Sequence, residues 1–495
     1  MLNSMNLAID NRCSGFSAAA LKRFAAWRVG CAGVFILLIA LLCATPAWAD
    51  VRKTDAICGT TMEDRGIRAA KCPSIEAEHA ILVDGDGTVY FERDAYSAAN
   101  IASVTKVMTA LVALNRAPLD TEIVVSARAA EVGESSAHLV EGDKMPLETA
   151  LKALMMPSGN DAALAIAETV GHLLLAEATS SGTQLTDSSG NAITGTDDDA
   201  ALKVFVAAMN DQAKEVGCLD TVFTNPHGLD DGEWAGKLHS TAADVAKFCA
   251  AAMANDTFRN IVSTDTATIQ VTRDGEKADI ELESTDELLG VYDGACGIKT
   301  GFTDLAGSCF AGAASRGGRD LYAIVLDSTS DAKRFEDATA LFDWGYENQI
   351  TYQLAHATDT VSMTANGVAS DVPVVAEVSM KAWIDKTVKA TFADPSKSVE
   401  VFALNGNVSQ SFEFAEIGGA VSAGDVVGKA TFYQANKVIA TVDIVAAESV
   451  AAPNIFESFG IWWDRLFKGF SGEAQYAESI VLNDTPLIYD KQSLS

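Results

Sequence analysis

The stretch 101–114, IASVTKVMTALVAL, sets a serine and a lysine three residues apart at the start of an apolar run with helical spacing. Residues three apart on a helix share one face, so the amine of Lys106 can reach the hydroxyl of Ser103. Apolar neighbours such as Val107 and Met108 favour the neutral form of a buried lysine, and only that form can act as a base. The spacing therefore indicates a serine nucleophile with a lysine base.

Taken alone, the Ser-x-x-Lys pattern is weak, because a helix cap followed by a lysine that extends to solvent gives the same letters. Two further triplets favour a site. The stretch 157–160, PSGN, interrupts two helical segments, so it presents a hydroxyl and an amide on a loop. The stretch 299–301, KTG, falls on a predicted strand. Each triplet is common in proteins, but the three in this order are not.

The flanking segments predict one sheet that is built from both ends of the region 80–348. Residues 80–93, AILVDGDGTVYFER, alternate apolar and polar side chains around a Gly-Asp-Gly turn and predict a hairpin. Apolar runs between 294 and 327, with turns after Thr303 and near Gly317, predict further strands, and a helix follows them. Helices inserted between strands indicate an α+β (α/β) fold.

The inserted part is predicted to be mainly helical. The expected helices are 146–156, 161–175, 201–216 and one capped at Ser240 or Thr241. Residues 179–199 are polar and rich in turn formers, which predicts a mobile surface insertion.

The C-terminal part predicts an accessory domain and a surface helix. Short alternating segments without helical period indicate a separate β-sandwich at 349–450. Residues 451–472 carry an apolar stripe with charged residues opposite, which is typical of a helix lying in a membrane interface. The alternative is a helix packed on its own β-domain. Residues 473–495 are interpreted as a polar tail.

The N-terminus reads as an export signal. Lys22, Arg23 and Arg28 precede an apolar run, and small residues at Ala47 and Ala49 form a cleavage pattern. We therefore predict a signal peptide at 1–49, with an uncleaved membrane anchor as the alternative. Residues 50–79 are then an N-terminal extension of the exported protein.

Charge and cysteine usage narrow the class of partner. Loss of residues 1–49 would take the net charge from −31 to −34, which argues against nucleic acid as a partner. Six cysteines would remain, and an exported protein permits disulfides. We expect a first bridge from Cys58 to Cys72 and consider Cys296 facing Cys309 across a hairpin. Cys218 and Cys249 are read as packed thiols. Neither a metal site nor a cofactor is expected, because the ligand spacings are missing.

The ordered motifs resemble the penicillin-binding, SxxK family of serine acyl-enzymes, and more narrowly the low-molecular-mass D-alanyl-D-alanine carboxypeptidases. That resemblance implies a β-lactamase/transpeptidase-like sheet flanked by helices, with an inserted helical lobe. The matching stretches run from about 80 to 346 and read VDGDGTVYFERDA, ASVTKVMTALVAL, LMMPSGNDAALAIAE, FTNPHGLDD, HSTAADVAKF, GIKTGFTDLAGSCFAGAA and KRFEDATALFDWGY.

The resemblance also implies an activity and a place in the cell. Ser103 would attack the carbonyl between two D-alanines of a peptidoglycan stem peptide, and Lys106 would take its proton. Ser158 and Lys299 would relay a proton to the leaving amine. β-Lactam antibiotics would be covalent inhibitors. The enzyme would work at the extracytoplasmic face of the bacterial cell membrane or in the cell wall.

Binding roles follow from the same resemblance. Asn160 would hold a substrate amide, and Thr300 would bind the substrate carboxylate. Gly301 would let the substrate approach the strand closely. The backbone N–H groups of Ser103 and Phe302 would form the oxyanion hole.

Arg334 matches an arginine that follows the KTG hairpin in this family, and it is expected to help bind the terminal carboxylate. The alternative is a surface ion pair with Glu336 or Asp337. The middle triplet, SGN, is one that the carboxypeptidases use, whereas β-lactamases usually have an aspartate in its centre.

Other functions of the same or different class remain in competition. A transpeptidase shares the acylation step and differs only in the acceptor. A class A β-lactamase would need a glutamate with an asparagine four residues on, and none from Glu168 to Glu287 has one. A non-catalytic cell-wall scaffold would not need the reactive residues. A Ser-His-Asp esterase lacks its GxSxG motif, so His227 and His239 are read as structural.

Overall fold

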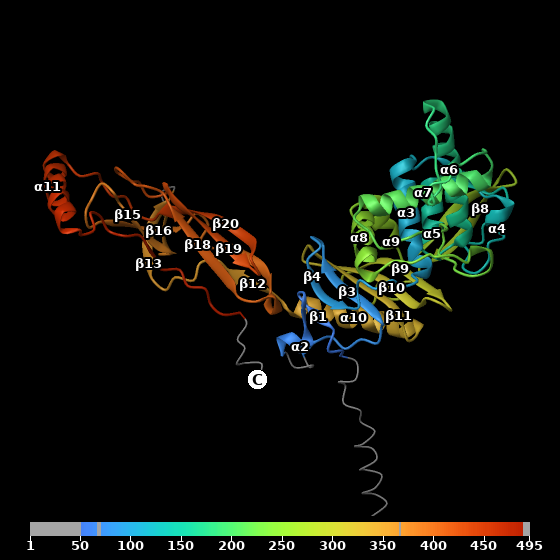
Figure 1. Cartoon of the computed structure of the whole chain (residues 1–495), viewed down its shortest axis with the longest axis horizontal. Helices are drawn as coiled ribbons and strands as arrows, with labels where there is room; N and C mark the ends of the chain where they lie inside the picture. The colour runs from blue at the N-terminus through green and yellow to red at the C-terminus, as the bar shows by residue number, and fades with distance from the viewer. Residues whose placement is uncertain (1–50, 67–70, 366–367, 489–495) are drawn as a thin grey trace, which may run out of the picture. The chain divides into compact units, whose positions relative to one another are not determined.

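The protein is described by a computed structural model that covers residues 51–66, 71–365 and 368–488 (Figure 1). The predicted signal peptide at 1–49 lies outside the described residues.

A seven-stranded antiparallel sheet forms the centre of the catalytic region, in the order β2-β1-β4-β3-β11-β10-β9. Strand β3 pairs with β11, with Ile81 opposite Ile324, so the first hairpin and the last three strands share one sheet, as predicted. The strands are β1 Ala56–Ile57, β2 Thr60–Thr61, β3 His79–Asp84, β4 Val89–Arg93, β9 Ala295–Thr303, β10 Gly307–Arg316 and β11 Arg319–Ser328.

Both faces of this sheet are buried, because alternate residues of a strand point to opposite sides. Ile81 and Ile324 belong to a cluster shared with the helical lobe. Leu82 and Ala323 belong to a second cluster, which is completed by helix α10, Asp331–Glu347. Figure 1 shows α10 and the helical lobe with the sheet between them. Edge strand β9 is therefore held firmly at the foot of the lobe.

The N-terminal extension adds β1, β2 and the short helix α2, Met62–Arg65, to the sheet. A buried ion pair fastens it. Arg93 Nε and Nη2 donate to the two carboxylate oxygens of Asp55 at 2.8 and 2.7 Å, and Arg93 is 1% exposed. Arg93 Nη1 also donates to the carbonyl oxygens of Ile75 and Ala77. If the Asp55 carboxylate is removed, the Arg93 guanidinium stays buried without a counter-ion, which destabilises the fold.

We predict that Asp55→Ala lowers the free energy of unfolding by about 3 to 5 kcal/mol, because the Arg93 guanidinium stays buried without its counter-ion. Urea denaturation followed by circular dichroism measures the change. The matched control is Glu63→Ala, which removes a 4.0 Å pair between largely exposed side chains and should change stability by about 0.5 kcal/mol or less. Equal effects of the two substitutions would contradict the prediction.

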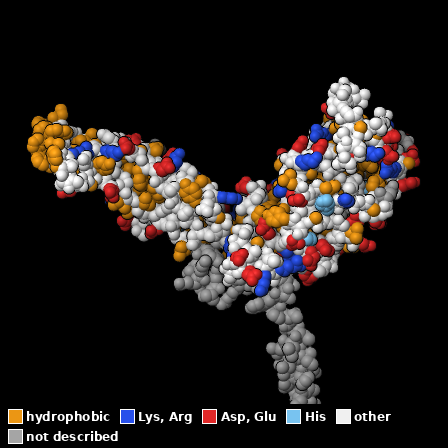
Figure 2. Space-filling view, in the orientation of Figure 1, with side chains coloured by type: hydrophobic (Ala, Val, Ile, Leu, Met, Phe, Trp, Pro, Cys, Tyr) orange, Lys and Arg blue, Asp and Glu red, His pale blue; other side chains and the backbone are white. Residues whose placement is uncertain are grey.

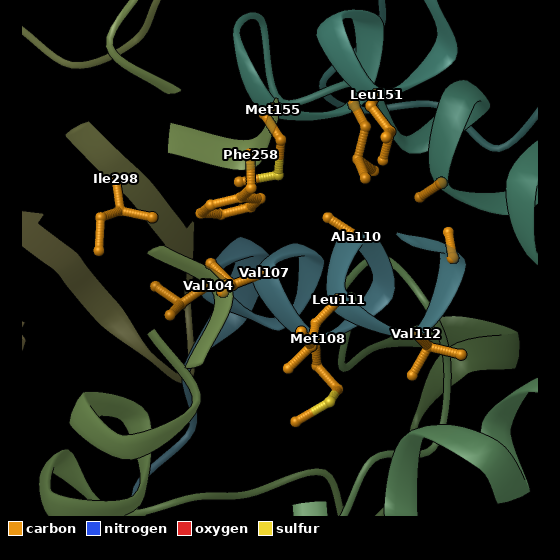
Figure 3. Packing of buried hydrophobic residues seen from close by; sticks show 14 of the residues in the cluster. Val104, Val107, Met108, Ala110, Leu111, Val112, Leu151, Met155, Phe258 and Ile298 are labelled. Carbon is orange, nitrogen blue, oxygen red and sulfur yellow. The ribbon is translucent and has the colours of Figure 1, made fainter. Parts of the chain in front are cut away.

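The helical lobe is arranged around α3, in which residues 105–113 are all buried. Figure 3 shows Val107 and Leu111 of α3 among side chains from Leu151, Met155 and Phe258. The helices of the lobe are α3 Thr105–Arg116, α4 Ala127–Ala130, α5 Leu147–Met155, α6 Asn160–Ser181, α7 Asp198–Glu215, α8 Ala242–Met253 and α9 Asp256–Val262.

The predicted insertion at 179–199 is shorter than expected, because both flanking helices extend into it. Helix α6 continues to Ser181 and ends at Gly182, whose φ of +68° closes the helix. Helix α7 starts early, because the Asp197 side chain accepts from Ala200 N. The residues between form an exposed turn around Asp187; their mobility stays a prediction. By length and composition α6 could cross a membrane, but most of it is buried in the described structure.

The lobe also contains a four-stranded sheet that we did not predict, in the order β5-β6-β7-β8. Its strands are β5 Glu122–Val124, β6 Lys144–Pro146, β7 Thr266–Arg273 and β8 Glu276–Glu283. Its hairpin β7–β8 leads directly into the segment before β9, so this sheet helps to position the edge of the central one.

The C-terminal region is β-rich with a hydrophobic core of its own, as expected. Its six-stranded sheet has the order β18-β19-β20-β16-β15-β21, and two further pairs join β12 to β17 and β13 to β14. The predicted polar tail contributes β21, which pairs with β15. The strands are β12 Gln349–Gln353, β13 Thr360–Ala365, β14 Val368–Pro373, β15 Ala376–Ser379, β16 Thr387–Phe392, β17 Ser398–Phe402, β18 Val408–Phe414, β19 Val426–Gln434, β20 Lys437–Ala446 and β21 Ile480–Val481.

The disulfide predictions were wrong, since all six cysteines of the described residues are free thiols. In the β9–β10 ladder, Cys309 stands opposite Gly301 and not Cys296, so those two sulfurs do not face each other. Cys58 and Cys72 are likewise unbridged. Cys218 and Cys249 are buried, as expected of packed thiols.

Candidate active site

Ser103 lies in a short 3-10 turn, Ala102–Val104, that leads into α3. In such a turn the side chains at i and i+3 nearly eclipse each other, which brings Lys106 over the serine. Lys106 Nζ is 2.7 Å from Ser103 Oγ, a hydrogen-bond distance. Ala102 adopts a φ of +46°, which is strained for a residue with a β-carbon. The predicted nucleophile–base contact is therefore present at a strained position.

The Lys106 amine is enclosed. The side chain has no exposed surface, and Nζ is also 3.3 Å from Ser158 Oγ and donates to the His227 carbonyl oxygen at 3.1 Å. Burial holds the pKa of Lys106 well below its usual value, and the charge of Lys299 lowers it further, while Asp161 opposes the shift. Burial thus favours the neutral amine, which is the form that can accept a proton.

Ser158 lies in the loop before α6 as predicted, but Asn160 is the first residue of that helix, and both residues are buried and not exposed, although they line the cleft. Ser158 has a φ of +64°, so this serine is also strained. A Cβ on Gly159 would lie 2.7 Å from the Ala153 carbonyl oxygen, so only glycine fits there. Asn160 donates from Nδ2 to the Gly133 carbonyl oxygen at 3.0 Å, but its buried Oδ1 has no hydrogen-bond partner in the described structure. That oxygen is an acceptor left open for a ligand.

Strand β9 carries the KTG triplet against the nucleophile. A Cβ on Gly301 would lie 2.9 Å from the Ile101 carbonyl oxygen and 3.1 Å from Ser103 N. Thr300 Oγ1 is 2.6 Å from Thr285 Oγ1. Lys299 is buried, and burial together with the nearby Arg334 charge lowers its pKa to about 7, while Asp286 opposes the shift.

Arg334 lines this cleft and does not form the surface pair that was the alternative. Its guanidinium makes a 2.9 Å ion pair with Asp331 and donates to the Gly301 carbonyl oxygen at 3.3 Å. The two alternative partners are engaged elsewhere: Glu336 pairs with Lys333, and Asp337 accepts from the backbone of residues 76 and 77. Burial lowers the pKa of Arg334, so this cation is held close to the cleft at some cost.

The residues meet at one cleft of about 390 Å³. Seven of the nine predicted site residues line it, and Lys106 and Lys299 lie buried beside it. Phe302 is 58% exposed at the cleft surface. The seven lining residues are Ser103, Ser158, Asn160, Thr300, Gly301, Phe302 and Arg334.

Sequence reasoning missed several polar residues of the cleft. Thr285 contacts Thr300, Asp331 pairs with Arg334, and Asp230 accepts a hydrogen bond from Thr303 Oγ1 at 2.7 Å. Thr285 and Asp230 are single polar residues in loops without a spacing that marks them, whereas Asp331 stands three residues before Arg334 on α10, a helical spacing that could have indicated the pair. No group of three metal-ligating side chains occurs among the residues that the structure describes.

The geometry defines a serine acyl-transfer site. One cleft brings together a hydroxyl that is hydrogen-bonded to a neutral amine, the unpaired amide oxygen of Asn160, and strand β9 with its cationic Lys299. A family model described as D-alanyl-D-alanine carboxypeptidase (peptidase S11) matches residues 67–174 and 169–330. The chain therefore belongs to the D-alanyl-D-alanine carboxypeptidase family of serine peptidases, and the predicted resemblance and fold class are confirmed.

Individual relatives bear the same name. A D-alanyl-D-alanine carboxypeptidase of Streptomyces sp. strain K15 is 33% identical over 271 residues, which is 53% of this chain and 84% of that one. DacD of Escherichia coli is 27% identical over 403 residues, which is 78% of this chain and 89% of that one. The crystal structure titled Streptomyces K15 DD-transpeptidase is 31% identical with a TM-score of 0.49, and the match covers 56% of this chain and 98% of that one.

We predict that Gly301→Ala slows acylation of Ser103 by about a hundredfold, because the added methyl pushes β9 away from the nucleophile and reacting groups tolerate little displacement. The second-order rate of labelling by a fluorescent penicillin measures the effect. The matched control is Gly419→Ala, where an added Cβ meets nothing within 4 Å. A Gly301→Ala protein that labels at the control's rate would show that the close approach is not needed.

Proposed function

We propose that the protein removes the terminal D-alanine from peptidoglycan stem pentapeptides through an acyl-enzyme on Ser103. The observation that supports this most is the 2.7 Å contact between Ser103 Oγ and Lys106 Nζ in a cleft that keeps the amine neutral. Family membership supplies the substrate class, since the matching family and relatives are named for cleavage between two D-alanines.

The acylation step follows from these positions. Ser103 Oγ attacks the carbonyl carbon of the penultimate D-alanine while its proton passes to Lys106. The C–O bond forms and the negative charge on the carbonyl oxygen is received by the backbone N–H groups of Ser103 and Phe302. Each donor of this kind stabilises a transition state by about 2.7 to 4 kcal/mol. The C–N bond then breaks to leave an ester on Ser103.

Departure of D-alanine requires a proton on its amine. Ser158 Oγ lies 3.3 Å from Lys106 Nζ, so this hydroxyl can pass the proton from the lysine to the leaving nitrogen. Lys299, whose pKa of about 7 leaves it partly protonated at neutral pH, supports that transfer. Water then attacks the ester and restores the Ser103 hydroxyl, which completes hydrolysis.

Substrate recognition is assigned to polar groups that line the cleft. Asn160 Oδ1 is free to accept an N–H of the stem peptide. Thr300 and Arg334 line the same cleft and suit the terminal carboxylate, because a hydroxyl and a guanidinium both donate to it. Gly301 leaves room for the substrate backbone beside β9.

The test is incubation of the purified protein with a pentapeptide ending in D-alanyl-D-alanine, followed by mass spectrometry. We expect free D-alanine and tetrapeptide, and we expect Ser103→Ala to abolish both. Ser263→Ala, at the exposed end of α9, is the control and should leave the rate unchanged. Cross-linked peptide dimers in place of tetrapeptide would identify a transpeptidase, and an inert wild-type protein would refute the proposed activity.

We also propose that helix α11, Ile455–Ser471, lies on the extracytoplasmic face of the cell membrane. Bound there, it would keep the enzyme near the cell wall. The helix has a complete capping box, formed by Asn454 and Glu457, and no buried residue. Figure 2 shows its hydrophobic side chains gathered in one patch. Arg465 donates to the carbonyl oxygens of Lys381 and Trp383, so its polar side already has a partner in the β-domain. The exposed apolar residues are Ile455, Phe456, Phe459, Trp462, Trp463, Leu466, Phe467 and Phe470.

Membrane binding should be driven by apolar burial, because the protein carries a net charge of −31 and is repelled by anionic lipid. We therefore expect the protein to float with phosphatidylcholine vesicles and to stay bound in high salt. The double substitution Phe459→Asp and Trp463→Asp should release it. Leu219→Asp, at an apolar residue 80% exposed elsewhere, is the control, and equal release by both would refute the role of α11.

A further inference from the structure

Asp286 is a buried carboxylate that the mechanism above does not use. It lies in the link between β8 and β9 and is 4% exposed. Its Oδ1 accepts the backbone N–H of Leu288 at 3.0 Å, which is an ordinary turn contact. Its Oδ2 is buried and has no hydrogen-bond partner in the described structure. A buried carboxylate oxygen without a partner is costly and calls for an explanation.

The position of Asp286 links it to the KTG strand. Its neighbour Thr285 donates from its backbone to the Met156 carbonyl oxygen at 3.0 Å, just before the Ser158 loop. The Thr285 hydroxyl lies 2.6 Å from that of Thr300. The segment that carries Asp286 is thus clamped between the two triplets of the cleft. Asp286 is also close enough to Lys299 for each charge to act on the other.

Charge balance in the cleft leaves Lys299 in need of a counter-ion. The cations are Lys299 and Arg334, because Lys106 is held neutral, and the Arg334 charge disfavours the protonated form of Lys299. Arg334 has its own partner in Asp331. Among the residues that the structure describes, the only side-chain hydrogen bond of Lys299 is a long one, 3.4 Å, from Nζ to Thr300 Oγ1. The Lys299 amine is therefore buried with only one weak hydrogen bond to stabilise its charge.

A second buried carboxylate close to the lysines is already occupied. Asp161, which acts on Lys106, accepts from the Ser136 hydroxyl at 2.6 Å and from the backbone N–H groups of Ala137, Leu139 and Ala162. Its oxygens therefore hold the loop beside the cleft and are not available to Lys299. Asp286 is the carboxylate whose charge acts on Lys299, and its Oδ2 has no hydrogen-bond partner in the described structure.

We propose that Asp286 is a positioning residue for this reaction: its unpaired carboxylate oxygen is the counter-charge that keeps Lys299 an ammonium ion in the cleft. The inference rests on the proposed function at one point, which is that Lys299 acts in its protonated form during the reaction. Lys299 Nζ then remains a donor toward the leaving group and the substrate carboxylate, and Asp286 itself touches neither. Burial raises the pKa of Asp286 to about 6, so the carboxylate is ionised at neutral pH.

The sign of the pH effect follows from these charges. The pKa of Lys299 is already lowered to about 7 by burial and by Arg334, and Asp286 raises it. Removal of the Asp286 charge lowers that pKa further, so a larger fraction of Lys299 is neutral at neutral and alkaline pH. Below both pKa values Lys299 is protonated with or without Asp286. Loss of activity must therefore be confined to the alkaline side.

The test measures the second-order rate of Ser103 acylation by a fluorescent penicillin from about pH 5 to about pH 10. In Asp286→Asn, which retains an acceptor for Leu288, the alkaline limb should move to lower pH by about one unit. Above both limbs the rate should be about tenfold below wild type, and at the acidic end the two rates should agree. Asp265→Asn removes an exposed charge near Asp286 and should leave the limb in place.

A rate that falls equally at every pH would mean that Asp286 only supports the fold, and the proposal would be overturned. Should Asp286→Asn not fold, Asp286→Glu decides, because it retains the charge: the limb must stay at its wild-type position, and a limb moved to lower pH overturns the proposal. Wild-type acylation without release of D-alanine from the pentapeptide would refute the carboxypeptidase activity alone. A wild-type protein that is not acylated at all would refute both.

Discussion

The site depends on one constraint, which is that the Lys106 amine is buried with no solvent and few charges around it. Three oxygens surround this amine, and its hydrogen bond to Ser103 is the shortest of the three. A protonated lysine would be expensive in such a place, so the protein keeps the amine neutral and makes it a base. Helix α3 can hold it there because its other buried residues pack on every side. The hydrophobic core of the lobe therefore also lowers the pKa of Lys106 and makes this residue a base.

Much of this arrangement could be predicted from local patterns. The Ser103–Lys106 contact follows from helical spacing alone, and Pro157 forces the SGN loop out of both neighbouring helices. The pairing of the first hairpin with the last strands followed from alternating segments at both ends of the region, and the structure has that pairing. The four-stranded sheet was missed although the sequence carries a signal for its hairpin. Residues 266–273, TATIQVTR, alternate polar and apolar side chains, and the turn Asp274-Gly275 follows them.

What escaped prediction depends on contacts between distant parts of the chain. Thr285 and Asp286 belong to no recognisable motif in the sequence. Only the folded chain brings them close to β9. The cysteine predictions failed for a related reason, because separation along the sequence does not determine which residue stands opposite Cys309 in the ladder. Arg334 lines the cleft, as the resemblance implied, and its ion-pair partner, Asp331, stands at the i,i+3 helical spacing, a signal that sequence reasoning did not use.

The pairing of β3 with β11 has a consequence for biogenesis. Ile81 cannot pair with Ile324 until almost the whole catalytic region has been synthesised. Contacts of such high sequence separation slow folding and keep the early hairpin exposed. The nucleophile and the KTG strand also come from opposite ends of that interval, so the cleft cannot form on a nascent chain. The enzyme is therefore inactive until its catalytic region has been synthesised, and the first hairpin lacks its β11 partner until then.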